Sequence, residues 1–143
     1  MKTINAITQE IIAEFAQYDS VDEKYIHLFS LADSLPPMDP DLKNEATRVL
    51  GCQSKLWFWL SVDGDHFHLQ ADSDSTVIKA IASLLVRVVE NCPPEEIQDL
   101  SLDFINELKI WKLASERNNG LVAMLEHLKR EAAALSGEEV TGG

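Results

Sequence analysis

The chain has 143 residues, of which 45% are hydrophobic and 25% charged, a composition typical of one soluble globular domain. Its formal net charge of −12 argues against binding to nucleic acids or anionic membranes, because both need basic patches, and favours a basic partner surface or a simply solvated acidic one. No apolar run approaches the length of a membrane span, and Glu10 and Glu14 interrupt any signal-peptide pattern, so we expect a cytoplasmic protein.

Two amphipathic helices are predicted at the start of the chain. Apolar residues recur at helical spacing over residues 4–17, namely Ile4, Ile7, Ile11 and Phe15. The run Ser20-Val-Asp-Glu23 has the pattern of a capping box and begins the second helix. Pro36-Pro37 ends it, and its apolar stripe is expected to comprise Val21, Tyr25, Leu28, Ala32 and Leu35.

Three antiparallel strands are predicted next. Residues 46–50 can form a short strand, residues 55–62 form a stronger one, and residues 66–71 return after the hairpin signal Asp63-Gly64. Alternation places four apolar side chains of the second strand on one face: Leu56, Phe58, Leu60 and Val62.

The rest of the chain is predicted to be helical. Asp72-Ser-Asp-Ser75 offers several N-cap residues for a long apolar helix that ends near Asn91. Pro93-Pro94 begins a short acidic helix, Ser101 caps another over about residues 102–108, and a last amphipathic helix runs from Leu121 to Leu135 after an irregular stretch. The order of elements predicts an α+β domain over residues 1–136, with helices packed on a small three-stranded antiparallel sheet and a flexible tail over 137–143.

Cys52 is the first candidate for covalent chemistry. It follows Gly51, precedes Gln53-Ser54 and joins two apolar segments, so a turn there would present its thiol to a partner. A free cysteine is more often a small buried hydrophobe. Arg48 and Lys55 supply positive charge that favours the reactive thiolate, although no histidine and carboxylate pair lies nearby in the sequence.

The other cysteine and two histidines are weaker candidates. Cys92 ends an apolar helix and is expected to pack in the core, and with no C-x-x-C pair neither a disulfide scaffold nor structural zinc is predicted. His66 and His68 share one strand face, as metal ligands can. No third ligand has a convincing spacing, so we expect them on a semi-exposed face near Trp57 and Trp59.

Three charged residues complete the candidates. Asp72 and Asp74 form a carboxylate pair suited to acid–base work, but they also precede a helix, and a cap role is favoured for at least one of them. Arg117 precedes the last helix in Arg117-Asn-Asn-Gly120. There it either anchors a loop or engages a carboxylate, or the segment is only cap chemistry with a turn glycine.

Three motifs, taken in order, resemble the SufE/CsdE family. They are Val49-x-Gly-Cys-Gln-Ser-x-Leu-Trp57, Asp72-Ser-Asp74 followed by Ile78-Lys79, and Arg117-x-x-Gly120-Leu121. The resemblance covers about residues 3 to 136. The family usually has asparagine where this chain has Thr47, and glycine where it has Ala80.

The resemblance implies a sulfur acceptor. Family members take persulfide sulfur from a PLP-dependent cysteine desulfurase (SufS- or CsdA-like), stimulate it, and pass the sulfur to an iron–sulfur scaffold such as SufBCD or to another acceptor. Cys52 would carry the sulfur, and the loop and partner surface would comprise Gly51, Gln53, Ser54, Asp72, Asp74 and Arg117. The resemblance also implies a fold like that of the scaffold protein IscU. The chain lacks the three-cysteine ligand set of IscU, so no cluster assembly, metal or cofactor of its own is expected.

Two other functions remain compatible with the sequence. The first is a thiol-based redox enzyme that uses Cys52, such as a thiol peroxidase, which would turn over peroxide with a thiol reductant alone. The second is a noncatalytic adaptor that binds a desulfurase and would keep its stimulating effect in Cys52→Ser. The sequence does not separate a Suf-type from a Csd-type partner.

Overall fold

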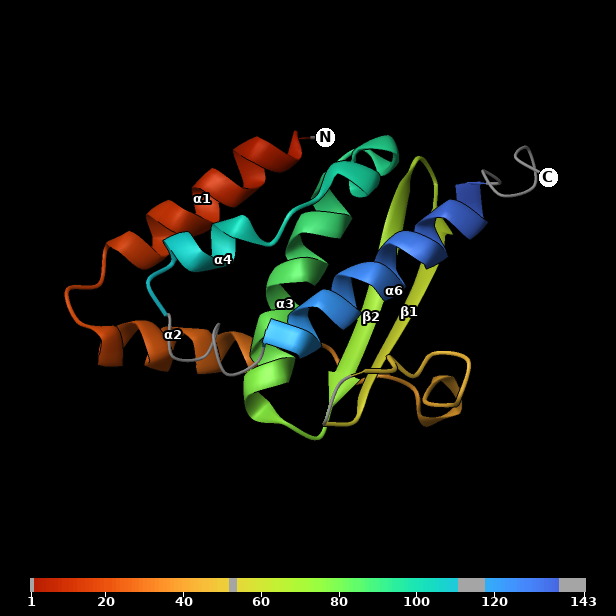
Figure 1. Ribbon diagram of the computed structural model, residues 1–143, viewed down its shortest axis with the longest axis horizontal. Helices are drawn as coiled ribbons and strands as arrows, with labels where there is room; N and C mark the ends of the chain where they lie inside the picture. The colour runs from red at the N-terminus through yellow and green to blue at the C-terminus, as the bar shows by residue number, and fades with distance from the viewer. Residues whose placement is uncertain (1, 52–53, 111–117, 137–143) are drawn as a thin grey trace.

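The computed structural model describes residues 2–51, 54–110 and 118–136. One antiparallel hairpin lies at one side of the molecule with helices packed against it, which confirms the predicted α+β class (Figure 1). In chain order the elements are α1 (Ile4–Ala16), α2 (Val21–Asp33), the 3-10 turn η1 (Pro40–Leu42), β1 (Leu56–Asp63), β2 (His66–Ser73), α3 (Thr76–Asn91), the 3-10 helix η2 (Pro94–Asp99), α4 (Asp103–Glu107) and α6 (Asn118–Ser136). No helix within the described ranges is both long enough and apolar enough to cross a bilayer.

The first two helices begin at polar caps. The Thr3 hydroxyl accepts a hydrogen bond from the Ala6 N–H at 3.1 Å. The Ser20 hydroxyl accepts from the Glu23 N–H at 3.1 Å and donates to the Glu23 carboxylate, so the predicted cap of α2 is confirmed.

The predicted stripe of α2 is only partly buried. Leu28 and Ala32, in the second half of the helix, are buried against the core. Tyr25 is half-buried against the same core, whereas Val21, the first residue of α2, is 42% exposed. The prediction was therefore wrong at the helix start.

The sheet has two strands rather than the predicted three. β1 and β2 pair along their whole length, and Gly64 (φ +66°) lies in the turn between them. Residues 46–50 contribute only one bridge, between Arg48 and Trp57. The segment leaves the sheet after this bridge because the chain turns away at Gly51, where φ is +92°.

The two faces of the hairpin differ in burial. The inner face lies against α3 and α6 and carries Leu56, Phe58, Leu60, Phe67, Leu69 and Ala71, all buried. The outer face is half-exposed and carries Trp57, Trp59, Ser61, His66, His68 and Gln70. Val62, expected on the inner face, is 56% exposed because it lies beside the turn, at the end of the hairpin.

α3 is the central helix of the core. Its buried residues are Ile78, Ala80, Ile81, Ala82, Leu84, Leu85, Val88 and Val89. Its N-cap is Ser75, whose hydroxyl accepts from the Ile78 N–H at 3.3 Å. Neither Asp72 nor Asp74 caps the helix, so the cap role favoured for one of them was wrong.

The last turn of α3 is tied to β2 through Glu90. One carboxylate oxygen of Glu90 accepts from the Leu69 N–H at 3.1 Å and contacts His68 Nδ1 at 2.6 Å. The backbone N–H of Leu69, on the edge of β2 that does not pair with β1, thereby has a hydrogen-bond partner.

The C-terminal part follows the predicted order with small shifts. α4 begins at Asp103, whose N–H donates to the Ser101 hydroxyl at 3.1 Å, one residue later than predicted. α6 begins at Asn118, inside the stretch expected to be irregular, and packs on β1 and η2. The predicted tail, residues 137–143, lies outside the described residues.

Candidate functional site

Residues 50–55 connect two segments of the chain that are hydrogen-bonded to each other. The Val49 N–H donates to the Leu56 carbonyl at 2.8 Å, and the Phe58 N–H donates to the Thr47 carbonyl at 2.9 Å. Two backbone hydrogen bonds therefore fix the base of this connection. We call residues 50–55 the Cys52 loop.

Part of the predicted site falls outside the described residues. Cys52, Gln53 and Arg117 are among the residues that the structure does not describe. The described residues of the loop next to Cys52 are Leu50 and Gly51. Both are exposed, Leu50 to 75%, so the incoming side of the loop is open to solvent.

Thr47 anchors the incoming side of the loop. Its side chain is buried, its hydroxyl donates to the Leu42 carbonyl, and the same oxygen accepts from the Asn44 N–H at 3.2 Å. The sequence showed Thr47 only as a departure from the family pattern. The structure shows that its hydroxyl holds the preceding turn against the base of the loop.

Two independent features of the structure disfavour any residue other than glycine at position 51. Its φ of +92° is a backbone conformation that residues with a side chain rarely adopt. A Cβ placed on Gly51 would also lie 3.3 Å from the Cβ of Ala123 on α6. The loop therefore passes close to the last helix of the chain at the residue directly before Cys52.

Asp74 and Ser73 hold the outgoing side of the loop. The Lys55 N–H donates to Asp74 Oδ1 at 2.9 Å, and the Asp74 N–H donates to the Lys55 carbonyl at 3.2 Å. The Ser73 hydroxyl donates to the same carbonyl at 2.6 Å. Asp74, predicted as a cap or partner residue, thus positions the chain directly after Ser54.

Asp72 lies between two lysines. Its carboxylate contacts Lys43 Nζ closely, contacts Lys79 Nζ at 3.5 Å, and accepts from the Ser73 N–H at 2.8 Å. Burial raises the pKa of Asp72, but the hydrogen bonds from Lys43 and Ser73 and the two lysine charges outweigh it, so the pKa lies below its ordinary value. Asp72 is therefore an ionised partner of lysines and is poorly suited to donate a proton.

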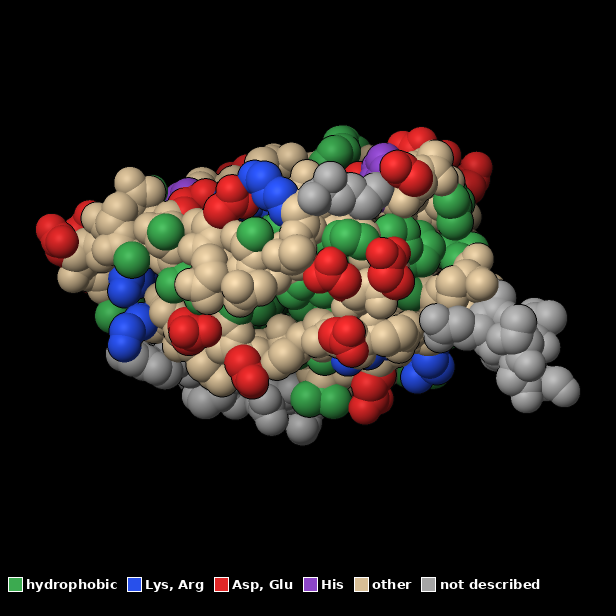
Figure 2. Space-filling view, turned by 90° about the horizontal axis from the view of Figure 1, so that it is seen from above, with side chains coloured by type: hydrophobic (Ala, Val, Ile, Leu, Met, Phe, Trp, Pro, Cys, Tyr) green, Lys and Arg blue, Asp and Glu red, His purple; other side chains and the backbone are tan. Residues whose placement is uncertain are grey.

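Cationic side chains gather beside the loop although the chain as a whole is acidic. Lys43 Nζ lies 5.4 Å from the centre of the Trp57 ring, and the guanidinium carbon of Arg48 lies 5.9 Å from it. Lys55 and Lys79 belong to the same region. Elsewhere acidic side chains prevail, and Figure 2 shows one face on which Asp and Glu outnumber Lys and Arg.

His127 is a buried residue near the loop that sequence reasoning missed. It lies one turn after Ala123 on α6, is 6% exposed, and directs its ring edge-on to Phe58 with centroids 6.2 Å apart. Burial lowers its pKa, with the nearby Glu131 charge opposing only in part, and its Nε2 has no hydrogen-bond partner among the described residues. The apolar pattern of the helix did not reveal it, because histidine occurs on both the buried and the exposed face of a helix.

Cys92 is fully buried at the end of α3, as predicted. Burial, with a smaller contribution from the Glu96 charge, raises its pKa to about 11, so it is a thiol at neutral pH. Both strand histidines face carboxylates, His66 those of Asp63 and Asp65 and His68 that of Glu90. No group of three or more potential metal ligands occurs among the described residues.

Comparison with known protein families decides the assignment. The model of the SufE family, described as an Fe-S metabolism associated domain, matches residues 9–132. The chain belongs to the SufE family. This confirms the resemblance drawn from the three sequence motifs and links the chain to iron–sulfur metabolism.

Curated relatives of this SufE-family chain differ widely in length. SufE-like protein 1 of Arabidopsis thaliana, chloroplastic/mitochondrial, is 34% identical over 135 residues, which are 92% of this chain and 36% of that protein. The chloroplastic quinolinate synthase of the same plant is 29% identical over 137 residues, 91% of this chain and 19% of that enzyme. An uncharacterised SufE-like protein of Rhizobium etli is 24% identical over 133 residues, 89% of this chain and 90% of its own length. The chain thus spans well under half of the two plant proteins.

A solved structure shares the fold. The solution structure of a hypothetical protein from Thermus thermophilus superposes with a TM-score of 0.75 at 21% identity, over 90% of this chain and 95% of that one. This agreement supports the arrangement of the helices and the small sheet.

Proposed function

We propose that this chain is a sulfur acceptor that takes persulfide sulfur from a PLP-dependent cysteine desulfurase onto Cys52. It then passes the sulfur to an iron–sulfur assembly scaffold or another acceptor, and it stimulates the desulfurase. The observation that carries the proposal is the Cys52 loop in a SufE-family chain: both ends are fixed by hydrogen bonds, and an exposed glycine precedes the cysteine.

The proposed transfer is a thiol exchange with no net oxidation. The Cys52 thiolate attacks the outer sulfur of the desulfurase persulfide, the bond between outer and inner sulfur breaks, and the desulfurase cysteine leaves as a thiolate. Cys52 then carries the outer sulfur as a persulfide. A second attack by an acceptor thiolate on that sulfur releases the Cys52 thiolate again.

The surroundings of the loop support this chemistry in two ways. Exchange needs an accessible thiolate, and the described neighbours Leu50 and Gly51 are exposed. Nearby positive charge favours a thiolate, and Arg48 precedes the loop while Lys55 is its last residue; Lys43, in the same region, is paired with Asp72.

The proposed test measures sulfur on the protein itself. The chain is incubated with cysteine and a PLP-dependent cysteine desulfurase, and the tryptic peptide that contains Cys52 is examined by mass spectrometry without reductant. We expect the mass of an added sulfur atom on this peptide and none in Cys52→Ser. Desulfurase stimulation that persists fully in Cys52→Ser would show an adaptor instead, and peroxide turnover with a thiol reductant alone would show a redox enzyme.

The partner surface is proposed to include Gly51, Gln53, Ser54, Asp72, Asp74 and Arg117. Because Asp74 also holds the Lys55 N–H, its charge and its hydrogen bond must be separated. Asp74→Asn keeps an acceptor oxygen, whereas Asp74→Arg reverses the charge and removes the acceptor. We expect desulfurase binding to change more in Asp74→Arg than in Asp74→Asn. Unchanged binding and stimulation in both Asp74→Arg and Arg117→Ala would remove these two residues from the surface.

The extent and location of the unit are part of the proposal. We propose a single SufE domain over residues 1–136, supported by the family match over residues 9–132. The cytoplasmic location expected from the sequence stays a prediction, since the plant relatives carry chloroplast and mitochondrial names.

A further inference from the structure

α2 has an outward face that no described element covers. Of the seven large hydrophobic side chains that are exposed in the described residues, three belong to this helix: Val21, Ile26 at 69% and Phe29 at 37%. The ring of Phe29 stacks on that of Tyr25 with centroids 6.2 Å apart. A concentration of this kind on one helix marks a candidate contact surface, because single exposed hydrophobic residues are otherwise scattered.

An open cavity lies beside this face. Its volume is about 340 Å³, and it is lined by Tyr18, Glu23, Ile26, His27 and Ser30, at the junction of α1 and α2. Figure 1 places this junction at one end of the molecule, far from the hairpin and the segment that leads into the Cys52 loop. The cavity is therefore distinct from the proposed sulfur-transfer site.

A chain of hydrogen bonds fixes where the protons of this cavity lie. The Glu14 carboxylate accepts from Arg87 Nη1 at 2.9 Å and contacts His27 Nε2 at 2.6 Å. Burial raises the pKa of Glu14, but the bonds from His27 and Arg87 outweigh it, so the pKa lies below its ordinary value. An ionised carboxylate can only accept, and His27 Nε2 must therefore carry a proton.

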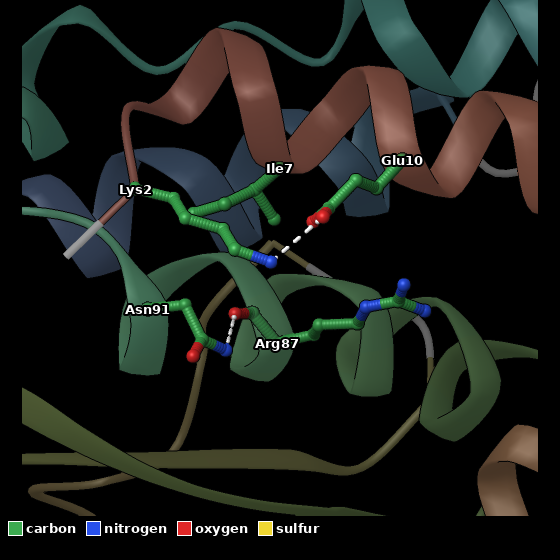
Figure 3. Close-up of a pocket in the computed structure, with 5 residues that line it drawn as sticks. All are labelled: Lys2, Ile7, Glu10, Arg87 and Asn91. Carbon is green, nitrogen blue, oxygen red and sulfur yellow. Dashed lines mark hydrogen bonds and ion pairs between the residues drawn. The ribbon is translucent and has the colours of Figure 1, made fainter.

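Arg87, which donates to Glu14 in this network, also borders a second cavity. That cavity, of about 250 Å³, is lined by Lys2, Ile7, Glu10, Arg87 and Asn91. Figure 3 shows the Lys2 ammonium directed at the Glu10 carboxylate, to which it is bound at 2.7 Å. Both cations of the second cavity are thus paired, and we assign no ligand to it.

The proton on His27 Nε2 determines the polarity of the first cavity. In the tautomer with its proton on Nε2, the ring offers Nδ1 as an acceptor, and the Tyr18 hydroxyl at 3.2 Å donates to it. The Ser30 hydroxyl donates to the His27 carbonyl at 2.6 Å. The Glu23 carboxylate already receives the Ser20 hydroxyl proton and has none of its own. Every polar side-chain atom left for a ligand on Tyr18, Glu23 and Ser30 is therefore an acceptor.

We propose that this cavity binds the ammonium or guanidinium group of a lysine or arginine side chain from a protein partner. A cationic group brings several donors and no acceptor, which complements an acceptor-only lining, and Glu23 supplies the opposite charge. Exposed Asp19 and Asp22 add negative charge nearby. Ile26 contacts the aliphatic stem of the inserted side chain, and apolar neighbours of that side chain rest on Ile26 and Phe29.

The experiment compares two peptides that differ only in charge. The ¹⁵N-labelled protein is titrated at about pH 8 with acetyl-Leu-Arg-Leu-amide and with its citrulline counterpart. We expect amide shifts centred on Tyr18, Ile26 and Ser30, with the arginine peptide bound about threefold more tightly, as for an exposed ion pair. Equal affinity of the two peptides, or shifts spread over the acidic surface, would overturn the proposal.

Three variants locate the site. Glu23→Gln and Tyr18→Phe are each expected to weaken binding of the arginine peptide about threefold, because the first removes the negative charge, the second removes a hydroxyl acceptor, and both leave the cavity walls in place. Ile26→Ser weakens both peptides by removing the apolar contact. Glu126→Gln, which removes an exposed charge of α6, is the matched control and should bind like the wild type. Wild-type affinity in both Glu23→Gln and Tyr18→Phe would contradict the assignment.

A third ligand tests whether the cavity binds a side chain of a protein or only a free cationic group. Free arginine amide has the same cationic group without the apolar neighbours. We expect it to bind more weakly than the peptide. If it binds as tightly as the peptide, the apolar face of α2 takes no part, and the inference of a protein partner is wrong.

Discussion

The described residues around the two cysteine positions differ in exposure and in charge. Cys92 lies fully buried at the end of α3, and burial with the Glu96 charge raises its pKa to about 11. The described neighbours of Cys52 are exposed, and cationic side chains lie beside the loop. Cys92 is therefore a core hydrophobe, whereas the residues next to Cys52 leave room for the proposed role of sulfur carrier.

The largest expected effect separates the two cysteines directly. Cys52→Ser should abolish transfer of sulfur from a desulfurase, because the attacking sulfur atom is gone, whereas Cys92→Ala should keep transfer at the wild-type level. Bound sulfur is measured by mass spectrometry of the intact protein. Loss of transfer in a well-folded Cys92→Ala protein would show a relay between the two cysteines and end the contrast.

The second effect concerns the glycine before Cys52. Gly51→Ala meets both the left-handed backbone and the Cβ of Ala123, and we expect it to lower the free energy of unfolding by about 2 kcal/mol and to slow sulfur transfer several-fold. Denaturant titration measures the change in the free energy of unfolding, and the rate of sulfur loading measures the change in transfer.

A second glycine offers a matched control. Gly64→Ala in the hairpin turn has a similar φ of +66° and open space around the added Cβ. We expect it to cost about 1 kcal/mol and to leave transfer unchanged. Equal behaviour of the two variants would mean that contact with α6 is unimportant for the loop.

The third effect tests the burial of Cys92. Cys92→Ala should lower the free energy of unfolding by about 1–2 kcal/mol at neutral pH, because it leaves a small cavity. The folded pKa is about 11 against an ordinary 9.0, so the neutral thiol stabilises the fold below pH 9.0, and this contribution is lost as the pH rises toward 11. Urea titrations at neutral and alkaline pH should therefore show the wild type approaching Cys92→Ala. A constant gap between the two would contradict the raised pKa.

The smallest expected effect is a loss of stability in acid, and it comes from Asp72 in the region of the Cys52 loop. The folded pKa of Asp72 lies below its ordinary 3.8, so ionised Asp72 stabilises the fold above that value, and the contribution is lost as the pH falls through the folded pKa. Asp72→Asn should thus be slightly less stable than the wild type at neutral pH, and the gap should close in acid. Lys43→Met should show a reduced acid dependence, since it removes the main partner. An identical acid dependence in all three proteins would separate Asp72 from these lysines.

The sequence predicted best the elements whose apolar pattern extends over several turns. α3 is buried along one broad face, so its long apolar pattern was unambiguous. The cap at Ser20 was also predictable, because a capping box is a local interaction within four residues.

Errors arose where a distant element decides the outcome. Residues 46–50 have the composition of a strand, yet only one bridge forms, because Thr47 and Gly51 turn the chain away from β1. A cap role was favoured for at least one of Asp72 and Asp74 because they precede α3, but the Asp74 carboxylate accepts from the Lys55 N–H, nineteen residues earlier in the chain. No local pattern reveals such a partner.

The sequence motifs name candidate residues of the site, and these stay predictions. The contacts that support the loop were not predictable. Lys43 pairs with Asp72, Ser73 binds the Lys55 carbonyl and His127 packs against Phe58, and in each pair the partners lie far apart in the sequence. Only the fold brings such partners together.

Glu90 has a consequence for how copies of this chain behave at high concentration. In this two-stranded sheet residues 47–49 cover part of the β1 edge, and a free edge such as that of β2 is a template for pairing with another chain. On β2 the Glu90 carboxylate already occupies the Leu69 N–H and places a negative charge beside the strand. An approaching strand would have to displace this charge from its hydrogen bond, so the edge resists the strand addition that begins aggregation.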